Sequence, residues 1–468
     1  MNVLRNILFI FCAIFAFAIS SCISDDITYS SDANLSFSTD TVSFGTIFTD
    51  LTTPTARLQV YNRNDKGVIV SSIKFRDPDT PFRLNVDGVS GQSFTDVEIR
   101  ANDSIYIFLE CFIDENNEFE PQRISDQLEF VTNGVTQNVE VEAWAWNVTR
   151  LYSFTVSENT SFTAQRPYII FDTLTVEPGV TLNIEPGAWL LFHDKASMKV
   201  KGTLLALGES DNFIRMSGDR LDDILPDVPY DQLAGQWGGV DIAPESFGNR
   251  LEFVNMRSTV SGLRVDSCGD LSKNKLTLVN SWLHNSQGNV LSSEYAAVDA
   301  YGCCFSEAAG SVVRLIGGKH NFVQCTIANS YLFSSFFQPN LYLGHCLQHE
   351  QEENDQPLMM ASFENGIVWG EIGDPLYPGD LIGSNVFMRY MLFKADGSDD
   401  ENFIECVWNE NPLFYTVRDD YYFNYELQPD SPALGRGNPS YVTPECLYDM
   451  NGVYRLANGY PALGAYSE

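Results

Sequence analysis

Residues 174–182 read LTVEPGVTL, and residues 183–188 continue NIEPGA. Apolar and polar positions alternate in both stretches, and each run ends in a Pro-Gly pair. Alternation of this kind predicts short β-strands, and Pro-Gly is typical of a tight turn. The two Pro-Gly pairs lie 8 residues apart, and residues 202–208 continue the pattern as GTLLALG. The stretch therefore predicts several very short strands joined by tight turns.

A second pattern recurs at a longer period. A small residue stands at Ser281, Cys303, Cys325 and Cys346, at intervals of 22, 22 and 21 residues. This period is too long for an α-helical stripe, and periods above about 20 residues are typical of solenoids. Together the two patterns resemble the coils of a right-handed parallel β-helix with the pectin lyase-like fold, which we expect at residues 150–468. The four small residues are then expected to stack as a ladder inside it.

The end of the chain is expected to close this solenoid. It contains Asn411–Phe414, Asp430–Gly435 and Asp449–Arg455, and it resembles the C-terminal end of bacterial surface β-helices. An uncovered terminal coil would leave strand edges open to other chains. We therefore predict a C-terminal cap.

The preceding domain, at residues 33–147, is also expected to be all-β. Val68–Ile73, Ile105–Phe112 and Val139–Trp146 are rich in β-branched and aromatic residues, and no stretch has a helical period. Several short strands within one domain favour a β-sandwich. The segments LSF at 35–37, VSFGT at 42–46 and LQVYN at 58–62 resemble the immunoglobulin-like domains of hydin. That resemblance implies a spacer or an adhesion module.

The first residues have the features of an export signal. Arg5 precedes an apolar run of 13 residues, Ile7–Ile19, which is short for a membrane-spanning helix of about 20 residues. Ser20 and Ser21 precede Cys22, and this arrangement resembles a bacterial lipobox. The resemblance implies cleavage of residues 1–21, lipidation of Cys22 and a tether at residues 22–32. The alternative is an ordinary secretory signal, in which Cys22 has no special role.

The acidic residues Asp25 and Asp26 follow this cysteine closely. They resemble the surface-export signal of Bacteroides-type outer-membrane lipoproteins. The resemblance implies a lipid-anchored protein exposed at the cell surface.

The chain is strongly acidic. Its 468 residues include 28 Lys and Arg against 62 Asp and Glu, which gives a formal net charge of −34. Phosphates would repel such a surface, so nucleic acid is excluded as a partner. Attraction of the surface charge to anionic lipid is excluded for the same reason.

Eight cysteines remain after Cys12 and Cys22 are set aside. An even number outside the cytoplasm permits disulfides. Stacked coils lie about 4.8 Å apart, however, which is beyond the Cβ separation of about 3.5–4.5 Å that a disulfide needs. We therefore expect the ladder cysteines Cys303, Cys325 and Cys346 to be buried and reduced. Cys304 should face outward and be the more reactive thiol.

No complete catalytic motif is present. The Asp pairs of the chain lack the partner motifs of polygalacturonase-like hydrolases. A lyase needs a base near a neutralised uronate, and Arg314, Lys319 and His320 lie close together in the sequence. These three are weak catalytic candidates, and an exposed charged loop is the alternative.

Two acidic segments are weak candidates for metal binding. His345 and His349 precede a run of carboxylates at 350–355, and two imidazoles with carboxylates can hold zinc. Asp222 and Asp223 belong to an insert between Ile214 and Val240, where calcium is the candidate ion. The alternatives are a solvated acidic loop and a structural lid.

Exposed aromatic rings commonly stack on sugars, and one stretch is rich in them. Tyr331, Phe336 and Tyr342 are the ligand-binding candidates, and Phe333 and Phe337 lie among them. Alternation along a strand would turn about half of these rings into the core. A core role is therefore the alternative.

These patterns predict a non-catalytic cell-surface lipoprotein that binds or adheres to a partner, with a polysaccharide or a surface protein as the candidate ligand. The first alternative is a polysaccharide lyase or glycoside hydrolase that acts on an extended acidic glycan. The second is a structural component of an outer-membrane complex.

Overall fold

The computed structural model describes residues 26–225, 228–333, 338–345, 358–371, 376–377, 384–417 and 422–467. These residues form an all-β protein, in which the described helical segments are short 3-10 turns and none is an α-helix. The chain divides into two compact units, residues 1–147 and residues 148–468. The predicted signal sequence and Cys22 lie outside the described residues.

Unit 1 contains two sheets. The first has the order β1 (Ser36–Phe37), β3 (Ala56–Asn62), β9 (Asp103–Cys111), β5 (Phe82–Val86) and β6 (Val89–Gly91). The second has the order β2 (Thr41–Phe48), β11 (Val135–Trp146), β10 (Gln122–Thr132), β4 (Val68–Phe75) and β7 (Ser93–Phe94), with β8 (Val97–Ile99) also paired to β4. Most neighbours are antiparallel, whereas β2 runs parallel to β11.

The apolar side chains of both sheets form one buried cluster in unit 1. Alternation produces this cluster: in β9, Ile107 and Leu109 are fully buried while Tyr106 and Phe108 point outward and are exposed. The predicted strands at Val68–Ile73 and Val139–Trp146 are confirmed by β4 and β11.

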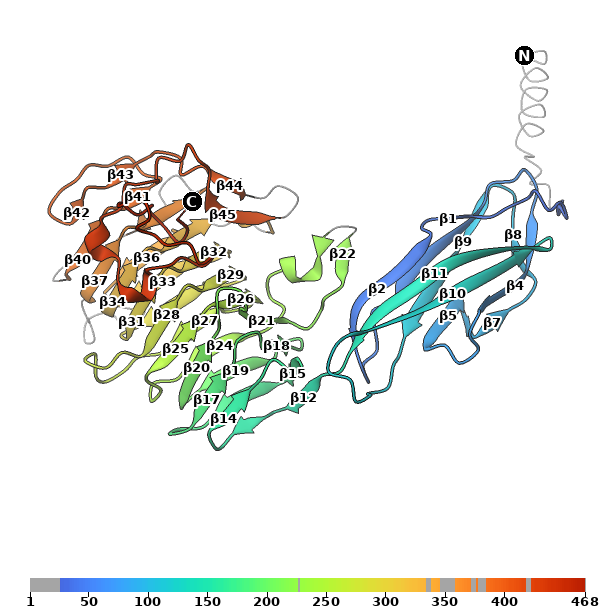
Figure 1. The fold of residues 1–468 in the computed structure, drawn as a ribbon, viewed down its shortest axis with the longest axis horizontal. Helices are drawn as coiled ribbons and strands as arrows, with labels where there is room; N and C mark the ends of the chain where they lie inside the picture. The colour runs from blue at the N-terminus through green and yellow to red at the C-terminus, as the bar shows by residue number, and fades with distance from the viewer. Residues whose placement is uncertain are drawn as a thin grey trace, which may run out of the picture. The chain divides into compact units, whose positions relative to one another are not determined.

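Unit 2 contains three long parallel sheets (Figure 1). Sheet 1 has the order β12 (Thr149–Tyr152), β15 (Tyr168–Phe171), β18 (Trp189–Phe192), β21 (Ile214–Gly218), β26 (Val254–Thr259), β29 (Trp282–Ser286), β32 (Cys304–Ala308), β35 (Thr326–Asn329), β38 (Ile367–Gly370), β41 (Leu392–Phe393) and β43 (Val407–Trp408). Sheet 2 has the order β13 (Thr155–Val156), β16 (Thr173–Val176), β19 (Ser197–Val200), β24 (Gly239–Ile242), β27 (Leu263–Val265), β30 (Leu291–Glu294), β33 (Val313–Ile316), β36 (Leu341–Gly344) and β39 (Leu376–Tyr377). Sheet 3 has the order β14 (Thr160–Phe162), β17 (Thr181–Ile184), β20 (Thr203–Leu207), β25 (Asn249–Glu252), β28 (Leu276–Val279), β31 (Ala297–Tyr301), β34 (Gly318–Val323), β37 (Leu358–Glu364), β40 (Val386–Arg389) and β42 (Phe403–Ile404).

From β12 to β41, successive strands visit the three sheets in turn, apart from the separate pair β22 (Asp223–Leu225) and β23 (Val228–Pro229), so each of these coils contributes one strand to each sheet. This arrangement is consistent with the predicted parallel β-helix. The Pro-Gly stretch forms β16, β17 and β18, as its pattern predicts. Gly179 and Gly187 adopt φ values of 76° and 77°, which glycine adopts without a steric penalty.

The predicted ladder is present in part. Ser281, Cys303 and Cys325 are buried at the corner between sheet 3 and sheet 1, and both cysteines are free thiols. The next member is Gly366, because Thr326 pairs with Ile367 in the neighbouring coil. The prediction for Cys346 was wrong in this respect: that residue follows β36 of sheet 2, and its spacing of 21 residues from Cys325 is a coincidence. Cys346 itself lies outside the described residues.

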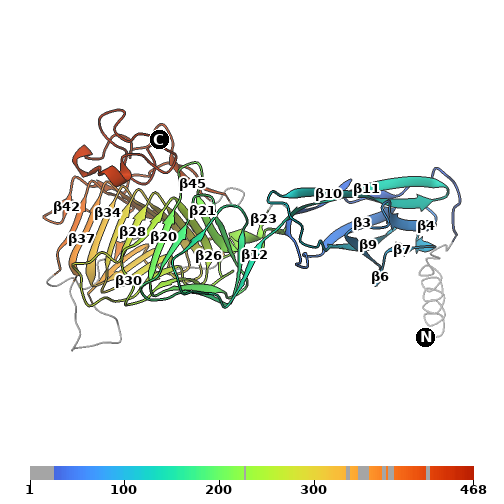
Figure 2. The ribbon, with the colours of Figure 1, turned by 60° about the horizontal axis from the view of Figure 1, so that its bottom comes forward.

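The last part of the chain packs along the side of the coils. We call the described residues of 411–467 the C-terminal cover; they include β44 (Phe414–Val417), β45 (Phe423–Leu427), η3 (Pro439–Tyr441) and η4 (Pro444–Cys446). The cover forms a buried cluster with outward-facing residues of sheet 1, among them Cys304, Ala328 and Ile367. Figures 1 and 2 show this red segment beside the stacked coils. We expected this segment to cover the terminal coil, but it packs against the flank of sheet 1.

This packing also corrects the expectation for Cys304. The side chain does point away from the solenoid interior, but the cover buries it completely. Burial raises the pKa of the Cys304 thiol well above its ordinary value. A protonated, inaccessible thiol is a poor nucleophile, so Cys304 is not a reactive cysteine.

Candidate functional site

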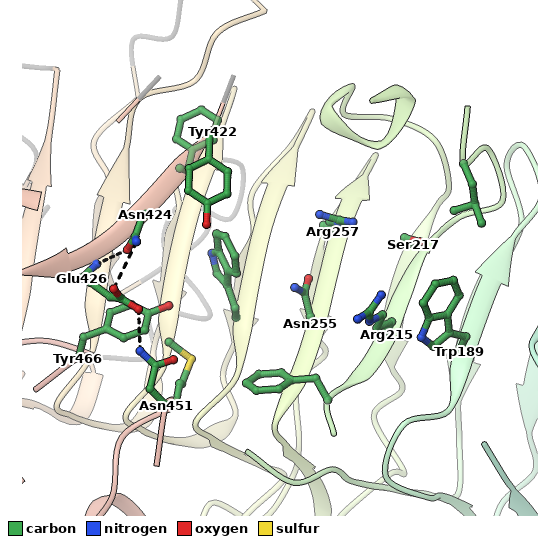
Figure 3. Close-up of a pocket in the computed structure, with 15 residues that line it drawn as sticks. Trp189, Arg215, Ser217, Asn255, Arg257, Tyr422, Asn424, Glu426, Asn451 and Tyr466 are labelled. Atoms are coloured by element: carbon green, nitrogen blue, oxygen red, sulfur yellow. Dashed lines mark hydrogen bonds between the residues drawn. The ribbon is translucent and has the colours of Figure 1, made fainter. Parts of the chain in front are cut away.

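A groove of about 460 Å³ lies on the outer face of sheet 1, where the C-terminal cover ends (Figure 3). It is lined by Trp189, Phe213, Arg215, Ser217, Leu221, Asn255, Arg257, Trp282, Tyr422, Phe423, Asn424, Glu426, Met450, Asn451 and Tyr466. Sheet 1 provides the floor, and the cover provides one wall.

Strand register builds the floor. Trp189, Arg215, Asn255 and Trp282 occupy equivalent outward positions on four successive coils, because each pairs with the next. Parallel pairing points these side chains in the same direction. The two indoles are three coil steps apart, or roughly 14 Å at the ordinary strand spacing. The row therefore forms an elongated surface with an aromatic ring at each end.

Contacts with neighbouring side chains hold both indoles. The guanidinium of Arg215 lies 4.6 Å from the centre of the Trp189 ring, which is a cation–π distance. The Trp282 ring stacks on His284 at 4.1 Å, and its Nε1 donates to Ser306 Oγ at 3.0 Å. Trp282 is therefore a fixed platform rather than a mobile side chain.

The cover contributes polar groups to the groove. Glu426 in β45 accepts hydrogen bonds from the amide nitrogens of Asn451, at 2.7 Å, and Asn424, at 3.3 Å (Figure 3). Tyr422 is 60% exposed and extends the aromatic surface at the rim. Burial raises the pKa of Tyr466 well above its ordinary value, so its hydroxyl remains protonated.

The charges of the groove are unusual for so acidic a chain. Its described lining contains two arginines, Arg215 and Arg257, and one carboxylate, Glu426. On the same outward face, beside Trp282, burial and the charge of Arg257 lower the pKa of His284 well below its ordinary value. His284 is therefore neutral at physiological pH.

This arrangement favours binding over hydrolysis. Most glycoside hydrolases place two carboxyl groups on either side of the scissile bond. Among the residues that line the groove, Glu426 is the one carboxylate, and two asparagine amides already donate to it. Aromatic faces with nearby amides and guanidinium groups are instead suited to holding a polar ring.

The three catalytic candidates from the sequence do not form a site. Arg314 lies in sheet 2, where it pairs with Glu294 at 3.1 Å, and Lys319 and His320 lie in sheet 3. Lys319 is exposed, whereas His320 is fully buried, and its Nε2 donates to the Gly317 carbonyl at 2.7 Å. The prediction that these residues act together was wrong because alternation turns His320 into the solenoid.

The buried His320 leads to a test of stability against pH. Burial lowers its pKa to about 4, against about 6.5 in an unfolded chain. A depressed pKa means that stability is fully present above pH 6.5 and is lost as the pH falls towards 4. We expect His320→Leu to reduce the loss of unfolding free energy between pH 7 and pH 4.5 by about 2–3 kcal/mol. Urea denaturation of both proteins at the two pH values measures this difference. An identical pH dependence in the variant would argue against a buried neutral imidazole.

The metal candidates that the structure describes are not assembled into a site. Arg220 donates to both carboxylate oxygens of Asp222, and Asp223 is exposed on β22 (Asp223–Leu225). His345 follows β36, and His349 lies outside the described residues. Within the described ranges, no group of three His, Cys, Asp or Glu side chains could hold a metal ion.

The insert that carries Asp222 has a different role. Together with β23 (Val228–Pro229) and η1 (Tyr230–Gln232), it packs beside sheet 1, where Asn285 Nδ2 donates to the Gln232 carbonyl at 2.8 Å. Leu221 from this insert lines the groove. The interpretation of the insert as a lid over one face is consistent with this position.

The two described aromatic candidates, Tyr331 and Tyr342, do not line the groove. Tyr331 is 5% exposed and meets Phe333 edge to face at 5.9 Å, which fits the core alternative. Tyr342 in sheet 2 lies under the guanidinium of Arg314, at 5.6 Å. Phe336 falls outside the described residues.

The groove is not among the sites predicted from the sequence, although the sequence contains one signal for it. Trp282 directly follows Ser281 of the ladder, so alternation places it outward. The same reasoning applies to Cys304, the equivalent position in the next coil, which the cover buries. Whether an outward position is open or covered depends on a segment more than 100 residues away.

Comparisons with known proteins add little to this geometry. No protein-family model matches the chain, and no curated protein matches it. Among solved structures, it is similar to a protein of unknown function from Porphyromonas gingivalis W83, with 12% identity and a TM-score of 0.19. The match covers 27% of this chain, which spans 60% of that protein's length. A likeness this weak supports no conclusion about function.

No helix in the described parts of the chain is long and apolar enough to cross a bilayer.

Proposed function

We propose that this chain is a cell-surface lipoprotein that binds a glycan in the groove of sheet 1 without cleaving it. A lipid on Cys22 would hold it in the outer membrane. Unit 1 would be an immunoglobulin-like sandwich, and unit 2 a right-handed parallel β-helix that presents the groove. The single observation that carries the binding function is the row from Trp189 to Trp282, an elongated floor with fixed indoles at both ends.

The polar groups of the groove support a glycan as the ligand. Sugar rings have an apolar face that packs on aromatic rings and hydroxyl groups at the edges that need hydrogen-bond partners. Asn255, Asn451 and Glu426 offer donors and acceptors beside the two indoles. The groove follows the stacking direction of the coils, which suits an extended polymer.

The chain path through unit 1 supports a spacer role. Near the proposed tether, Asn133 Nδ2 donates to the Ser30 carbonyl at 2.9 Å, so the chain begins its path beside the turn that precedes β11. It leaves unit 1 at Asn147, directly after the other end of β11. The 12 residues of β11 extend roughly 40 Å. The two attachment points therefore lie at opposite ends of the unit.

Incubation with polysaccharides tests the proposal. We would mix residues 23–468 with neutral and acidic polymers and detect polymer and protein after size-exclusion chromatography. We expect one polymer to co-elute at its original length, and Trp282→Ala to weaken that binding at least tenfold because the platform is lost. Tyr460→Ala is the control, since Tyr460 is 64% exposed on the cover but does not line the groove. Separate elution of every polymer would instead favour a structural role or a protein partner.

A lyase is the second candidate function. Arg257 and the neutral His284 are neighbours in register, and β-elimination from a uronate needs a cation and a base. His284 is 7% exposed and its ring is stacked against Trp282, which opposes this role in the observed conformation. Shortening of an acidic polymer that His284→Gln abolishes would establish the lyase and refute the non-catalytic proposal.

A further inference from the structure

Unit 1 has a cavity of its own on the outer face of its five-stranded sheet. Its volume is about 630 Å³, and it is lined by Thr55, Arg83, Leu84, Asn85, Ser90, Gly91, Gln92, Phe108 and Glu110. All of these residues belong to β3, β9, β5 and β6 or to the segments beside them. The proposed groove of unit 2 does not account for this cavity.

An aromatic ring lies at the centre of this face. Phe108 is 39% exposed, and strand pairing sets it between Arg57 of β3 and Asn85 of β5. The Tyr106 ring lies 6.3 Å away with a tilt of 23°, so the two rings form a nearly continuous surface. The guanidinium of Arg57 covers Tyr106 at 5.3 Å, which makes Phe108 the ring that faces the cavity.

Polar groups surround this ring. Asn85 Nδ2 donates to Ser90 Oγ at 3.1 Å, while Asn85 Oδ1 is buried and has no hydrogen-bond partner. Leaving such an acceptor unsatisfied costs about 1–3 kcal/mol. Glu110 adds a second acceptor, and Arg83 and Gln92 add donors. An outward turn of the Asn85 amide would present this enclosed oxygen to a ligand hydroxyl group and remove this cost.

The charges of the cavity are balanced. Arg83 and Glu110 are direct cross-strand partners, and they are the one cation and the one anion of the lining. A charged ligand would therefore face an opposing charge as well as an attracting one. The cavity favours a neutral ligand.

We propose that this cavity binds a neutral, hydroxyl-bearing ring: a single uncharged sugar residue, free or within a glycan. The apolar face of the sugar packs on Phe108, and its hydroxyl groups pair with Asn85 Oδ1, Glu110 and Gln92. This site is separate from the groove and does not depend on it. The volume suits a small molecule, since ligand pockets commonly measure about 300–1,000 Å³.

Saturation-transfer NMR tests the proposal on residues 23–468 carrying Trp282→Ala, so that the groove contributes little. The probes are methyl glycosides of neutral hexoses and N-acetylhexosamines, with methyl glucuronide and glucosamine as charged counterparts. We expect at least one neutral probe to bind and both charged probes to bind more weakly. Phe108→Ala should weaken the binding of the neutral probe at least tenfold.

Two further variants control the result. Val89→Ala alters a residue of β6 that is 62% exposed and does not line the cavity, so binding should be unchanged. Asn85→Leu removes the unpaired acceptor and should weaken binding even if Phe108→Ala fails to fold. The proposal is overturned if no neutral probe binds, if only charged probes bind, or if Phe108→Ala and Asn85→Leu bind as the parent does. Because the parent already lacks Trp282, a negative result for the cavity of unit 1 does not bear on the groove proposal.

Discussion

Replacing Arg455 with leucine is expected to detach the C-terminal cover from sheet 1 and to abolish binding in the groove. Arg455 is 3% exposed, and it donates to the carbonyls of Gly464, at 3.1 Å, and Ala465, at 2.6 Å. It also donates to Gln324 Oε1 of the solenoid, at 3.2 Å. One guanidinium therefore joins the cover to a coil corner.

Leucine would leave these buried acceptors without donors. Each buried acceptor left without a donor costs about 1–3 kcal/mol. We therefore expect the free energy that holds the cover on sheet 1 to fall by at least about 3 kcal/mol. Limited proteolysis should then cut within residues 411–467 under conditions in which the parent protein resists cleavage. Glycan binding should fall with it, because Asn424, Glu426 and Asn451 would leave the groove.

Arg436→Leu is the matched control, since Arg436 is an exposed arginine of the same segment. It should leave both cleavage and binding unchanged. If Arg455→Leu resisted proteolysis and bound glycan as the parent does, the role assigned to this guanidinium would be wrong.

A second large effect is expected at Lys275, which is fully buried in the solenoid. Its Nζ donates to three main-chain carbonyls: Ala243 at 2.8 Å, Pro244 at 3.0 Å and Ser267 at 3.2 Å. Burial lowers the pKa of this lysine, which means that burying its charged amine is unfavourable. The hydrogen bonds to the three carbonyls offset this cost. Methionine would preserve most of the volume of the side chain but none of the hydrogen bonds.

We expect Lys275→Met to lower the unfolding free energy by about 3 kcal/mol, because the carbonyls would be buried without donors. Lys273→Met is the control: Lys273 pairs with Asp270 at 3.5 Å on the surface, and exposed pairs contribute about 0–1 kcal/mol. Urea denaturation at neutral pH compares the two variants. Equal, small losses would show that water can replace the lysine.

Local patterns in the sequence were sufficient to predict the coils. The Pro-Gly pairs at 178–179 and 186–187 end strands in the structure, and the residues between them form β17. The ladder was predictable through Cys325, where the coils keep a spacing of 22 residues. It failed at Cys346 because the next coil is longer, and the equivalent position is Gly366. Period alone does not reveal an insertion within a coil.

The residues of the candidate site were harder to predict from the sequence. His320 lies two positions before Phe322 in β34, so strict alternation would have placed both side chains inside. Trp189 and Trp282 were outward by the same rule. To predict that the two indoles line one groove, one would need the strand register of the coils over residues 189–282 and the path of the cover. Both depend on contacts between residues far apart in the sequence. In the following coils, the outward residues Cys304, Ala328 and Ile367 are buried by the cover, which Arg455 joins to the coils.

The central claim is that a glycan occupies the groove between Trp189 and Trp282, and side-chain footprinting by mass spectrometry tests it most directly. Hydroxyl radicals would be applied to residues 23–468 with and without the polymer that co-elutes in chromatography. The account predicts that this polymer protects Trp189, Trp282 and the exposed ring of Tyr422, and leaves the equally exposed Tyr460 unprotected. Protection of other surfaces, with the oxidation of these three groove residues unchanged, would contradict it.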